Sequence, residues 1–333
     1  MAFRSVTLVL FATFLCAATE APPPPPVLQP YIKDGKFDPG DYGWLRGRFQ
    51  DASAEEAAAY EAFLQWSQQC WTTAHDELRA NLAAEGYPDA KVDNVNAAPL
   101  LCRTVASQPM ITDNSSFKMF ERELATATPV ALAYVTAARN ADEAARPRSK
   151  DLASELKART VGEQTIRMGL TWAMREDSDF PEMSPLARAI VRAHIGLAMA
   201  EYDHANTEWL KSVVAENGWP KISEVGEDAS GAAWLLVQHA DADPVFQLRA
   251  LNLMEPLVAQ KEVSARDYAY LTDRIALKLT GKQRYGTQYQ CVDGAYAPLP
   301  IADEAAVERL REEAGMESLA ENAARMQASY GRC

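Results

Sequence analysis

The sequence lacks the features that mark several large classes of protein. Basic residues are in deficit, with 33 Lys and Arg against 46 Asp and Glu, which gives a formal net charge of -13. A nucleic-acid binder needs a basic face for the phosphates, and docking on anionic lipid also needs one. The sequence therefore predicts no nucleic-acid partner. β-Branched runs are scarce and no stretch alternates with period two, so little or no β structure is expected.

Catalytic and metal-binding signatures are absent as well. The sequence contains no G-x-S-x-G elbow, no P-loop, no G-x-G-x-x-G and no H-E-x-x-H. Asp241 and Asp243 follow His239 at alternate positions, but they fall where a helix is ending, and the cysteines fit no zinc motif. Of the other histidines, His194 is expected in the core or at an interface and His75 facing solvent. We expect no cofactor and no metal, and whether the protein is an enzyme stays open.

The N-terminus has the form of an export signal. Residues 1–4 are a short basic start, and residues 5–15 are mostly apolar, long enough for a signal-peptide core and too short to span a bilayer. Cleavage is expected after Ala18. The alternatives are an uncleaved anchor or a lipid anchor on Cys16, which is disfavoured because Leu15 before it is not small. We expect an exported protein, periplasmic or extracellular, with no stable membrane span after cleavage; a lipoprotein is the less favoured form.

Cleavage of this signal would remove Cys16 and leave four cysteines. An even number of cysteines in an exported chain suggests two disulfides, for which three connectivities are possible. We favour Cys70–Cys102 and Cys291–Cys333 because each bond pairs two residues of one region.

The rest of the chain reads as an all-α protein, a bundle-like array of helices in two parts. The prolines at 22–26 predict a stiff, solvated spacer, and the basic break at 146–150 predicts a domain boundary. The expected divisions are a signal peptide (1–18), a proline-rich linker (19–40), an N-terminal helical region (41–149) and a C-terminal helical domain (150–333). Helices are predicted at 53–85, 115–126, 129–146, 151–176, 186–217, from a cap at Asp228, and at 244–260, 264–279, 302–314 and 317–328, with 281–301 as a loop.

Polar side chains interrupt the apolar faces of several predicted helices. Such positions are informative because a buried polar group must find a partner. Asp203 and Asn206 interrupt the buried stripe of the 186–217 helix. Comparable positions on the following helices are occupied by Gln238, His239, Gln247 and Arg274. We expect these six residues to meet in one network, with the loop 283–288 as its lid.

Roles within this network follow from side-chain chemistry. His239 is the best general acid or base, because an imidazole titrates near neutral pH. Asp203 or Asp273 would orient it, and Arg274 would hold an anion or stabilise developing negative charge. The abundance of Gln, Asn and Tyr favours hydrogen-bond recognition of a small polar or peptide-like ligand. The expected ligand-binding residues are Asn206, Gln238, Gln247, Arg274, Gln283, Tyr285 and Gln288.

Three functions are compatible with this pattern. The first is a binding module for a small polar or peptide-like ligand. The second is a hydrolase or transferase that uses His239 with Asp203 or Asp273. The third is a structural or interaction protein of the cell envelope, in which the polar network only determines how the helices pack. A cavity in which His239 lies within hydrogen-bond reach of a carboxylate would favour the enzyme.

The same polar residues carry a resemblance to a known family. Its motifs are, in chain order, Asp203 with Asn206, Gly218-Trp219-Pro220, Gln238-His239-Ala240-Asp241, Phe246-Gln247, Thr272-Asp273-Arg274 and Tyr285-Gly286-Thr287-Gln288. Over about residues 150–330, the chain resembles the bacterial family called domain of unknown function 6624. The resemblance implies a mostly helical domain and supplies no catalytic assignment. It favours a shared pocket over a purely architectural network, and residues 27–149 lie outside it.

Overall fold

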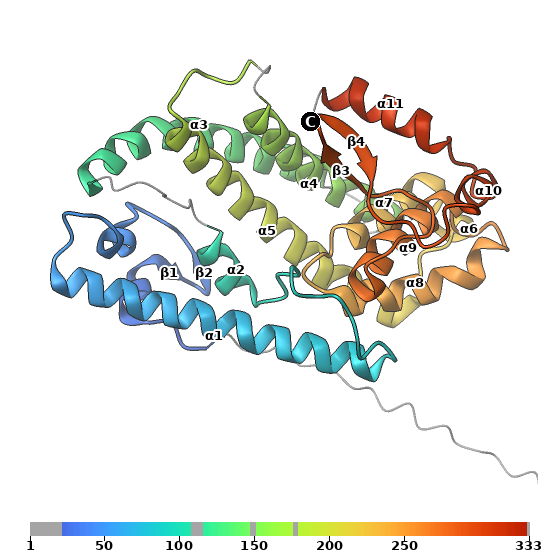
Figure 1. Cartoon of the computed structure of the whole chain (residues 1–333), viewed down its shortest axis with the longest axis horizontal. Coiled ribbons are helices and arrows are strands. Elements are labelled where there is room, and N and C mark those ends of the chain that lie inside the picture. The colour runs from blue at the N-terminus through green and yellow to red at the C-terminus, as the bar shows by residue number, and fades with distance from the viewer. Residues whose placement is uncertain (1–21, 108–115, 147–150, 176–178, 332–333) are drawn as a thin grey trace, which may run out of the picture.

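The computed structural model describes residues 22–107, 116–146, 151–175 and 179–331. Of these residues 68% are helical, in 13 helices, and the strands form two small two-stranded sheets, which confirms the all-α prediction (Figure 1). The short helices η1 (Pro26–Tyr31) and η2 (Gly43–Arg48) and the strands β1 (Ile32–Lys33) and β2 (Lys36–Phe37) precede the first long helix. The α-helices are α1 (Ala54–Ala84), α2 (Leu100–Ala106), α3 (Phe117–Ala145), α4 (Leu152–Met174), α5 (Pro185–Asn217), α6 (Ile222–Val225), α7 (Glu227–Gln238), α8 (Pro244–Val258), α9 (Ala265–Thr280), α10 (Val307–Glu313) and α11 (Leu319–Tyr330), with β3 (Tyr289–Val292) and β4 (Ala295–Pro298) between α9 and α10.

Helices α3, α4 and α5 pack against one another and form the central framework (Figure 1). Two glycines on α4 permit their close approach. A Cβ atom at Gly162 would lie 2.8 Å from the Tyr202 ring of α5, and one at Gly169 would overlap the Tyr134 ring of α3. The Tyr134 hydroxyl also donates to the Thr165 carbonyl at 2.8 Å. Because the backbones come so close, polar side chains on facing turns of α4 and α5 can pair directly.

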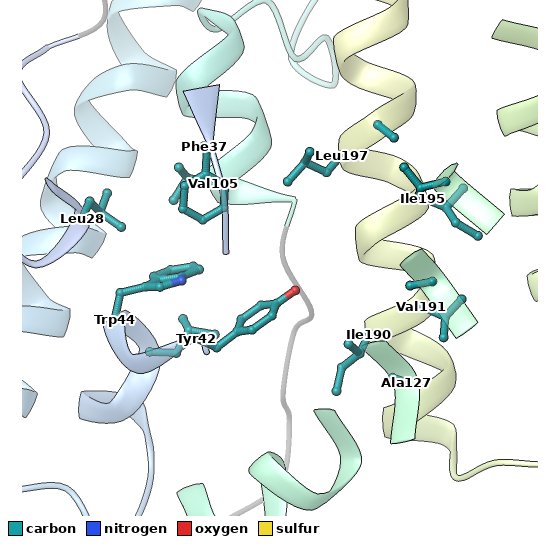
Figure 2. Packing of buried hydrophobic residues seen from close by; sticks show 14 of the residues in the cluster. Leu28, Phe37, Tyr42, Trp44, Val105, Ala127, Ile190, Val191, Ile195 and Leu197 are labelled. Atoms are coloured by element: carbon teal, nitrogen blue, oxygen red, sulfur yellow. The ribbon is translucent and has the colours of Figure 1, made fainter. Parts of the chain in front are cut away.

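The first hydrophobic core joins the N-terminal segments to α5. Figure 2 shows Trp44 and Tyr42 on one side of this core and Ile190 of α5 on the other. Residues 26–37 had been expected in a proline-rich linker, but they form η1 and the β1–β2 hairpin, and Leu28 and Phe37 are buried. Their apolar side chains remove more surface from water by packing here than an extended spacer would allow.

The second hydrophobic core lies around α7, α8 and α9. The end of α1 contributes Leu78 and Leu82 to it, and α9 contributes Leu271 and Leu279. Both cores contain residues from before and after residue 150. Hydrophobic packing is therefore continuous across the boundary that the basic break near residue 150 predicts.

Local capping signals mark the ends of several helices. The Ser53 hydroxyl accepts from the Glu56 N–H at 3.2 Å, and the Ser53 N–H donates to the Glu56 carboxylate at 2.8 Å, so a capping box begins α1. The Ser264 hydroxyl likewise begins α9. Gly218 ends α5 with a φ of 74°, a backbone conformation that glycine adopts without steric cost. The helices predicted at 53–85, 186–217 and 264–279 are present with nearly these bounds.

Two predictions of helix ends are wrong. The helices expected at 115–126 and 129–146 are one continuous helix, α3, with Pro129 inside it. Proline removes one backbone hydrogen bond, but Ala127 and Ala131 on either side are buried, so packing against α4 and α5 holds the helix together. Asp228 does not cap α7, because the helix begins at Glu227 with Gly226 as its N-cap.

The segment 281–301, expected as a loop, contains the antiparallel hairpin β3–β4. Tyr289 pairs with Pro298, and Val292 pairs with Ala295. The two residues between the strands, Asp293 and Gly294, have φ angles of 53° and 79°. Positive φ at both positions is the geometry of a tight hairpin turn, for which an Asp-Gly pair is the typical sequence.

The disulfide Cys70–Cys102 is present and connects α1 to α2, with Cα atoms 6.1 Å apart. The predicted Cys291–Cys333 bond includes Cys333, which lies outside the described residues. The prediction that His75 faces solvent is wrong. Only 5% of His75 is exposed, and its Nε2 lies 2.7 Å from the Val95 carbonyl oxygen, because the segment after α1 folds back over this face of the helix. Among the described residues, no helix is long and apolar enough to cross a membrane.

Replacing both Cys70 and Cys102 with alanine should lower the free energy of unfolding by about 2–4 kcal/mol, because the open chain gains conformational freedom. Urea denaturation of the full chain, followed by circular dichroism, measures this change. Thiol labelling of the denatured, unreduced wild type with peptide mapping is the control. Labelled Cys70 or Cys102 would contradict the bond.

Candidate functional site

A group of charged side chains gathers where α4, α5 and the end of α7 meet. Helix α4 supplies Glu163 and Arg167, which are four residues apart and therefore lie one turn apart on the same face. Helix α5 supplies Asp203, and His239 is the C-cap residue of α7. We refer to Glu163, Arg167, Asp203 and His239 as the Glu–His cluster.

Glu163 is the centre of the cluster and is fully buried. One oxygen of its carboxylate, Oε1, lies 2.6 Å from Nδ1 of His239 and also accepts a hydrogen bond from Nε of Arg167. The other, Oε2, accepts from the Gln164 amide at 2.5 Å. The contact between His239 Nδ1 and Glu163 is short, but its alignment in this structure is too poor for a hydrogen bond. Catalytic hydrogen bonds are often misaligned before a ligand binds.

Arg167 connects the two carboxylates of the cluster. Its terminal Nη2 donates to both oxygens of Asp203, at 2.6 and 2.7 Å, while its Nε donates to Glu163. Charge-assisted bonds of this kind are about twice as strong as neutral ones. Helices α4 and α5 are therefore joined by one guanidinium in a fixed orientation.

Burial and ion pairing shift the pKa values of Asp203 and Glu163 in opposite directions. Burial raises the pKa of Asp203 to about 6, although Arg167 and His239 oppose the shift. Burial alone would also raise the pKa of Glu163, but His239 and Arg167 outweigh it, so the pKa of Glu163 is lowered. Glu163 is therefore ionised at neutral pH, whereas Asp203 titrates within reach of the physiological range.

An ionised Glu163 determines which nitrogen of His239 carries the proton. A carboxylate can only accept hydrogen bonds, so the facing Nδ1 carries the proton of the neutral ring and Nε2 carries the lone pair. The His239 side chain is 15% exposed, and its Nε2 makes no hydrogen bond to another group in the described part of the chain. An oriented imidazole with a free Nε2 can accept and return a proton.

A second polar group is centred on Asp241, two residues after His239. Asp241 accepts from Arg274 and Lys278, each at 2.8 Å, and Lys278 also donates to Gln247 Oε1 at 2.7 Å. The Gln247 amide nitrogen donates to the carbonyls of Val237 and Gln238. Burial would raise the pKa of Asp241, but Arg274 and Lys278 outweigh it and hold that pKa well below its usual range. Arg274 therefore binds the Asp241 carboxylate, and the Gln247 amide binds backbone carbonyls.

The third polar group is a loop anchor. The fully buried Asp273 accepts the backbone N–H groups of Arg284, Tyr285 and Thr287, at 2.7, 2.9 and 2.8 Å. Gln283 donates to the carbonyls of Gln288 and Leu299 and accepts from the Gln288 N–H. These side chains hold the 283–288 segment in shape, so Asp273 does not orient His239.

The residues expected in one network are thus distributed over three groups. Asp203 and His239 come together in the Glu–His cluster, and Gln247 and Arg274 surround Asp241. Asn206 accepts from Arg159 at 3.3 Å, beside the cluster on α5. Asp273, Gln283, Tyr285 and Gln288 belong to the loop anchor, while the side-chain oxygen of Gln238 is buried without a partner among the described residues.

Sequence reasoning missed Glu163 and Arg167, although the signal that found Asp203 is present. Glu163 interrupts the stripe of Leu156, Ile166 and Ala173 on α4, all of which are buried. The same search for polar residues in apolar stripes, applied to the 151–176 helix, identifies Glu163.

Two further observations delimit the site. No group of three or more His, Cys, Asp or Glu side chains within the described part of the chain is arranged to hold a metal ion. A pocket of about 480 Å³ opens near the start of α7, lined by residues that include Lys157, Trp234 and Asp267. None of the residues predicted for the site lines this pocket.

The fold and the cluster together define an all-α protein with a buried carboxylate–histidine pair held by three helices. Residues 150–333, more than half of the chain, match the family of unknown function DUF6624, and the chain belongs to this family. No curated protein and no solved structure matches it.

Replacing Asp273 with asparagine should lower the free energy of unfolding by about 2–3 kcal/mol, because an amide cannot accept all three backbone N–H groups. Asp303 is the matched control, since it accepts two N–H groups in an exposed turn. The change D303N should cost less than about 1 kcal/mol. Equal losses in urea denaturation would contradict the anchoring role of Asp273.

Asp203 should make stability depend on pH. With its pKa raised to about 6 in the folded protein, the folded state binds this proton more tightly than the unfolded chain. The resulting stabilisation is present at low pH and is lost as the pH rises through 6. Between pH 4 and pH 7, the stability of the wild type relative to D203N should fall by about 2 kcal/mol. Urea denaturation at four pH values measures it; a constant or rising difference would contradict the raised pKa.

Proposed function

We propose that the protein is an exported hydrolase or transferase in which His239 is the general acid and base for a small polar or peptide-like substrate. The observation that carries this proposal is the 2.6 Å distance between Nδ1 of His239 and the fully buried carboxylate of Glu163. A histidine oriented through one nitrogen by a carboxylate, with the other nitrogen free, is a recurrent arrangement in acid–base catalysis.

The proton movements follow from this geometry. Nε2 of His239 removes a proton from a water molecule or a substrate hydroxyl as that oxygen attacks the electrophilic centre. The imidazolium that forms is stabilised by the adjacent Glu163, which stays ionised because its pKa is lowered. Nε2 then returns the proton to the leaving group. Arg167 keeps Glu163 in position and takes no part in the proton transfer.

Export is the second part of the proposal. The apolar stretch at residues 5–15 supports it, and so does the disulfide between Cys70 and Cys102. Disulfides form and persist in oxidising compartments and are rare in reducing ones.

A binding module for a small polar or peptide-like ligand is the second candidate. It is favoured by two buried amide atoms that have no partner among the described residues, Nδ2 of Asn206 and Oε1 of Gln238. The other predicted ligand-binding amides favour it less, because Gln247 and Gln283 already bind backbone groups.

The test of the enzyme proposal uses three chromogenic probes with the full chain. They are p-nitrophenyl acetate, alanyl-p-nitroanilide and p-nitrophenyl phosphate, which represent an ester, an amide and a phosphomonoester. For the probe that is hydrolysed, H239Q and E163Q should each lower kcat/KM by about 10²–10⁴-fold, the usual contribution of general acid–base catalysis.

The matched control is E155Q, which removes a carboxylate two turns earlier on α4 that pairs with Arg159. E155Q should keep the wild-type rate. Undiminished hydrolysis by H239Q would overturn the assignment. Failure of the wild type to hydrolyse any of the probes would favour the binding module, or a structural protein of the cell envelope if no ligand binds.

A further inference from the structure

A cavity distinct from the Glu–His cluster lies between α4 and the first turns of α7 and α9. Helix α7 packs against both α4 and α9 (Figure 1). The volume of the cavity is about 480 Å³, enough for a small molecule. Its polar lining includes Lys157 of α4, Glu227 and Asp228 of α7, and Ser264 and Asp267 at the start of α9. None of the four residues of the Glu–His cluster lines it.

The carboxylate of Asp267 has no hydrogen-bonding partner among the described residues, and it forms no ion pair there. The backbone N–H of Asp267 donates to the Ser264 hydroxyl at 3.3 Å, but the carboxylate does not complete a capping box. The adjacent guanidinium, of Arg266, lies over the Tyr270 ring, 5.7 Å from its centroid. Asp267 therefore presents an unpaired negative charge to the cavity.

The lining as a whole is negatively charged. The described lining carries one ammonium group, from Lys157, and three carboxylates, from Glu227, Asp228 and Asp267. Lys157 forms no ion pair with any of these carboxylates within the described part of the chain. Burial raises the pKa of Asp267 to about 6; Arg266 opposes this rise and Glu227 adds to it. A cation in the cavity would offset the cost of keeping Asp267 ionised.

The apolar part of the lining favours an organic cation over a metal ion. Trp234 and Ile222 line the same cavity, and the Trp234 ring meets the Tyr270 ring edge to face, with centroids 6.2 Å apart. Indole is the aromatic group that attracts cations most strongly. Among the described residues, no group of three or more His, Cys, Asp or Glu is arranged to hold a metal, so these carboxylates do not converge on one ion.

We propose that this cavity binds a small organic cation through an ammonium group, with Asp267 as its main acceptor. An ammonium group offers three N–H donors and forms charge-assisted hydrogen bonds with carboxylates. Glu227 adds negative potential beside Asp267, while Trp234 and Ile222 contact the hydrocarbon part of the ligand. The site goes beyond the proposed function and does not depend on His239.

The experiment is isothermal titration of the full chain at pH 8, where Asp267 is ionised and alkylamines are protonated. Butylammonium, butanol and butyrate are the probes, because they have equal numbers of carbon atoms and differ in charge. At constant ionic strength, the wild type should bind butylammonium at least about tenfold more tightly than the other two. D267N should weaken butylammonium binding by at least about tenfold, the effect of losing a charge-assisted hydrogen bond.

Four further variants make the result specific. D267E keeps the charge and should retain part of the binding. E227Q should also weaken binding, and it leaves α9 intact if D267N proves unstable in urea denaturation. The matched control is E255Q, because Glu255 is exposed on α8 and does not line the cavity; its affinity should equal that of the wild type. H239Q should bind butylammonium normally even if it has lost all catalysis, which separates this inference from the proposed function.

Two more probes distinguish the sources of an ammonium group. Tighter binding of putrescine than of L-lysine assigns the cavity to free amines, and the reverse order assigns it to amino acids. Equal affinities of D267N and the wild type for butylammonium, or tighter binding of butyrate than of butylammonium, would overturn the inference. The same loss in E255Q as in D267N would also overturn it, because only overall charge would then matter. So would a wild type that binds none of the three ammonium compounds.

Discussion

The burial of one carboxylate, Glu163, is the interaction on which the centre of this protein depends. Removing a carboxylate from water costs several kcal/mol unless partners surround it. Its partners come from two directions: Arg167 from its own helix and His239 from the end of α7. Arg167 also donates hydrogen bonds to Asp203, so the same guanidinium positions α5. The glycines of α4 make this possible, because they let the helices approach closely enough for direct pairing.

The family match and the packing divide the chain differently. The match begins at residue 150, whereas both hydrophobic cores contain residues from either side of that position. Side chains from η1, η2 and α1 share one hydrophobic core with α5, and the disulfide joins α2 to α1. The first part of the chain is therefore not an independent appendage of the family domain.

Local signals in the sequence predicted the helices well and the buried contacts less well. The Ser53 cap and Gly218 can each be recognised from a few neighbouring residues. The bounds of α1 and α5 were therefore predicted closely. Pro129 was misread as a break, because the packing that stabilises α3 involves helices distant in sequence. His75 was assigned to solvent for the same reason, since the segment that covers it arrives after the helix has ended.

Sequence patterns alone were sufficient for the all-α class, the Cys70–Cys102 bond and the recognition of Asp203 and His239 as unusual. Each depends on periodicity, cysteine count or composition along one stretch of chain. The partners of those two residues were decided by how the helices cross, because the spacing along a helix says which face a side chain occupies and not what lies opposite. Glu163, and neither Asp203 nor Asp273, is therefore the carboxylate that contacts His239; Asp203 pairs with Arg167, and Asp273 anchors a loop.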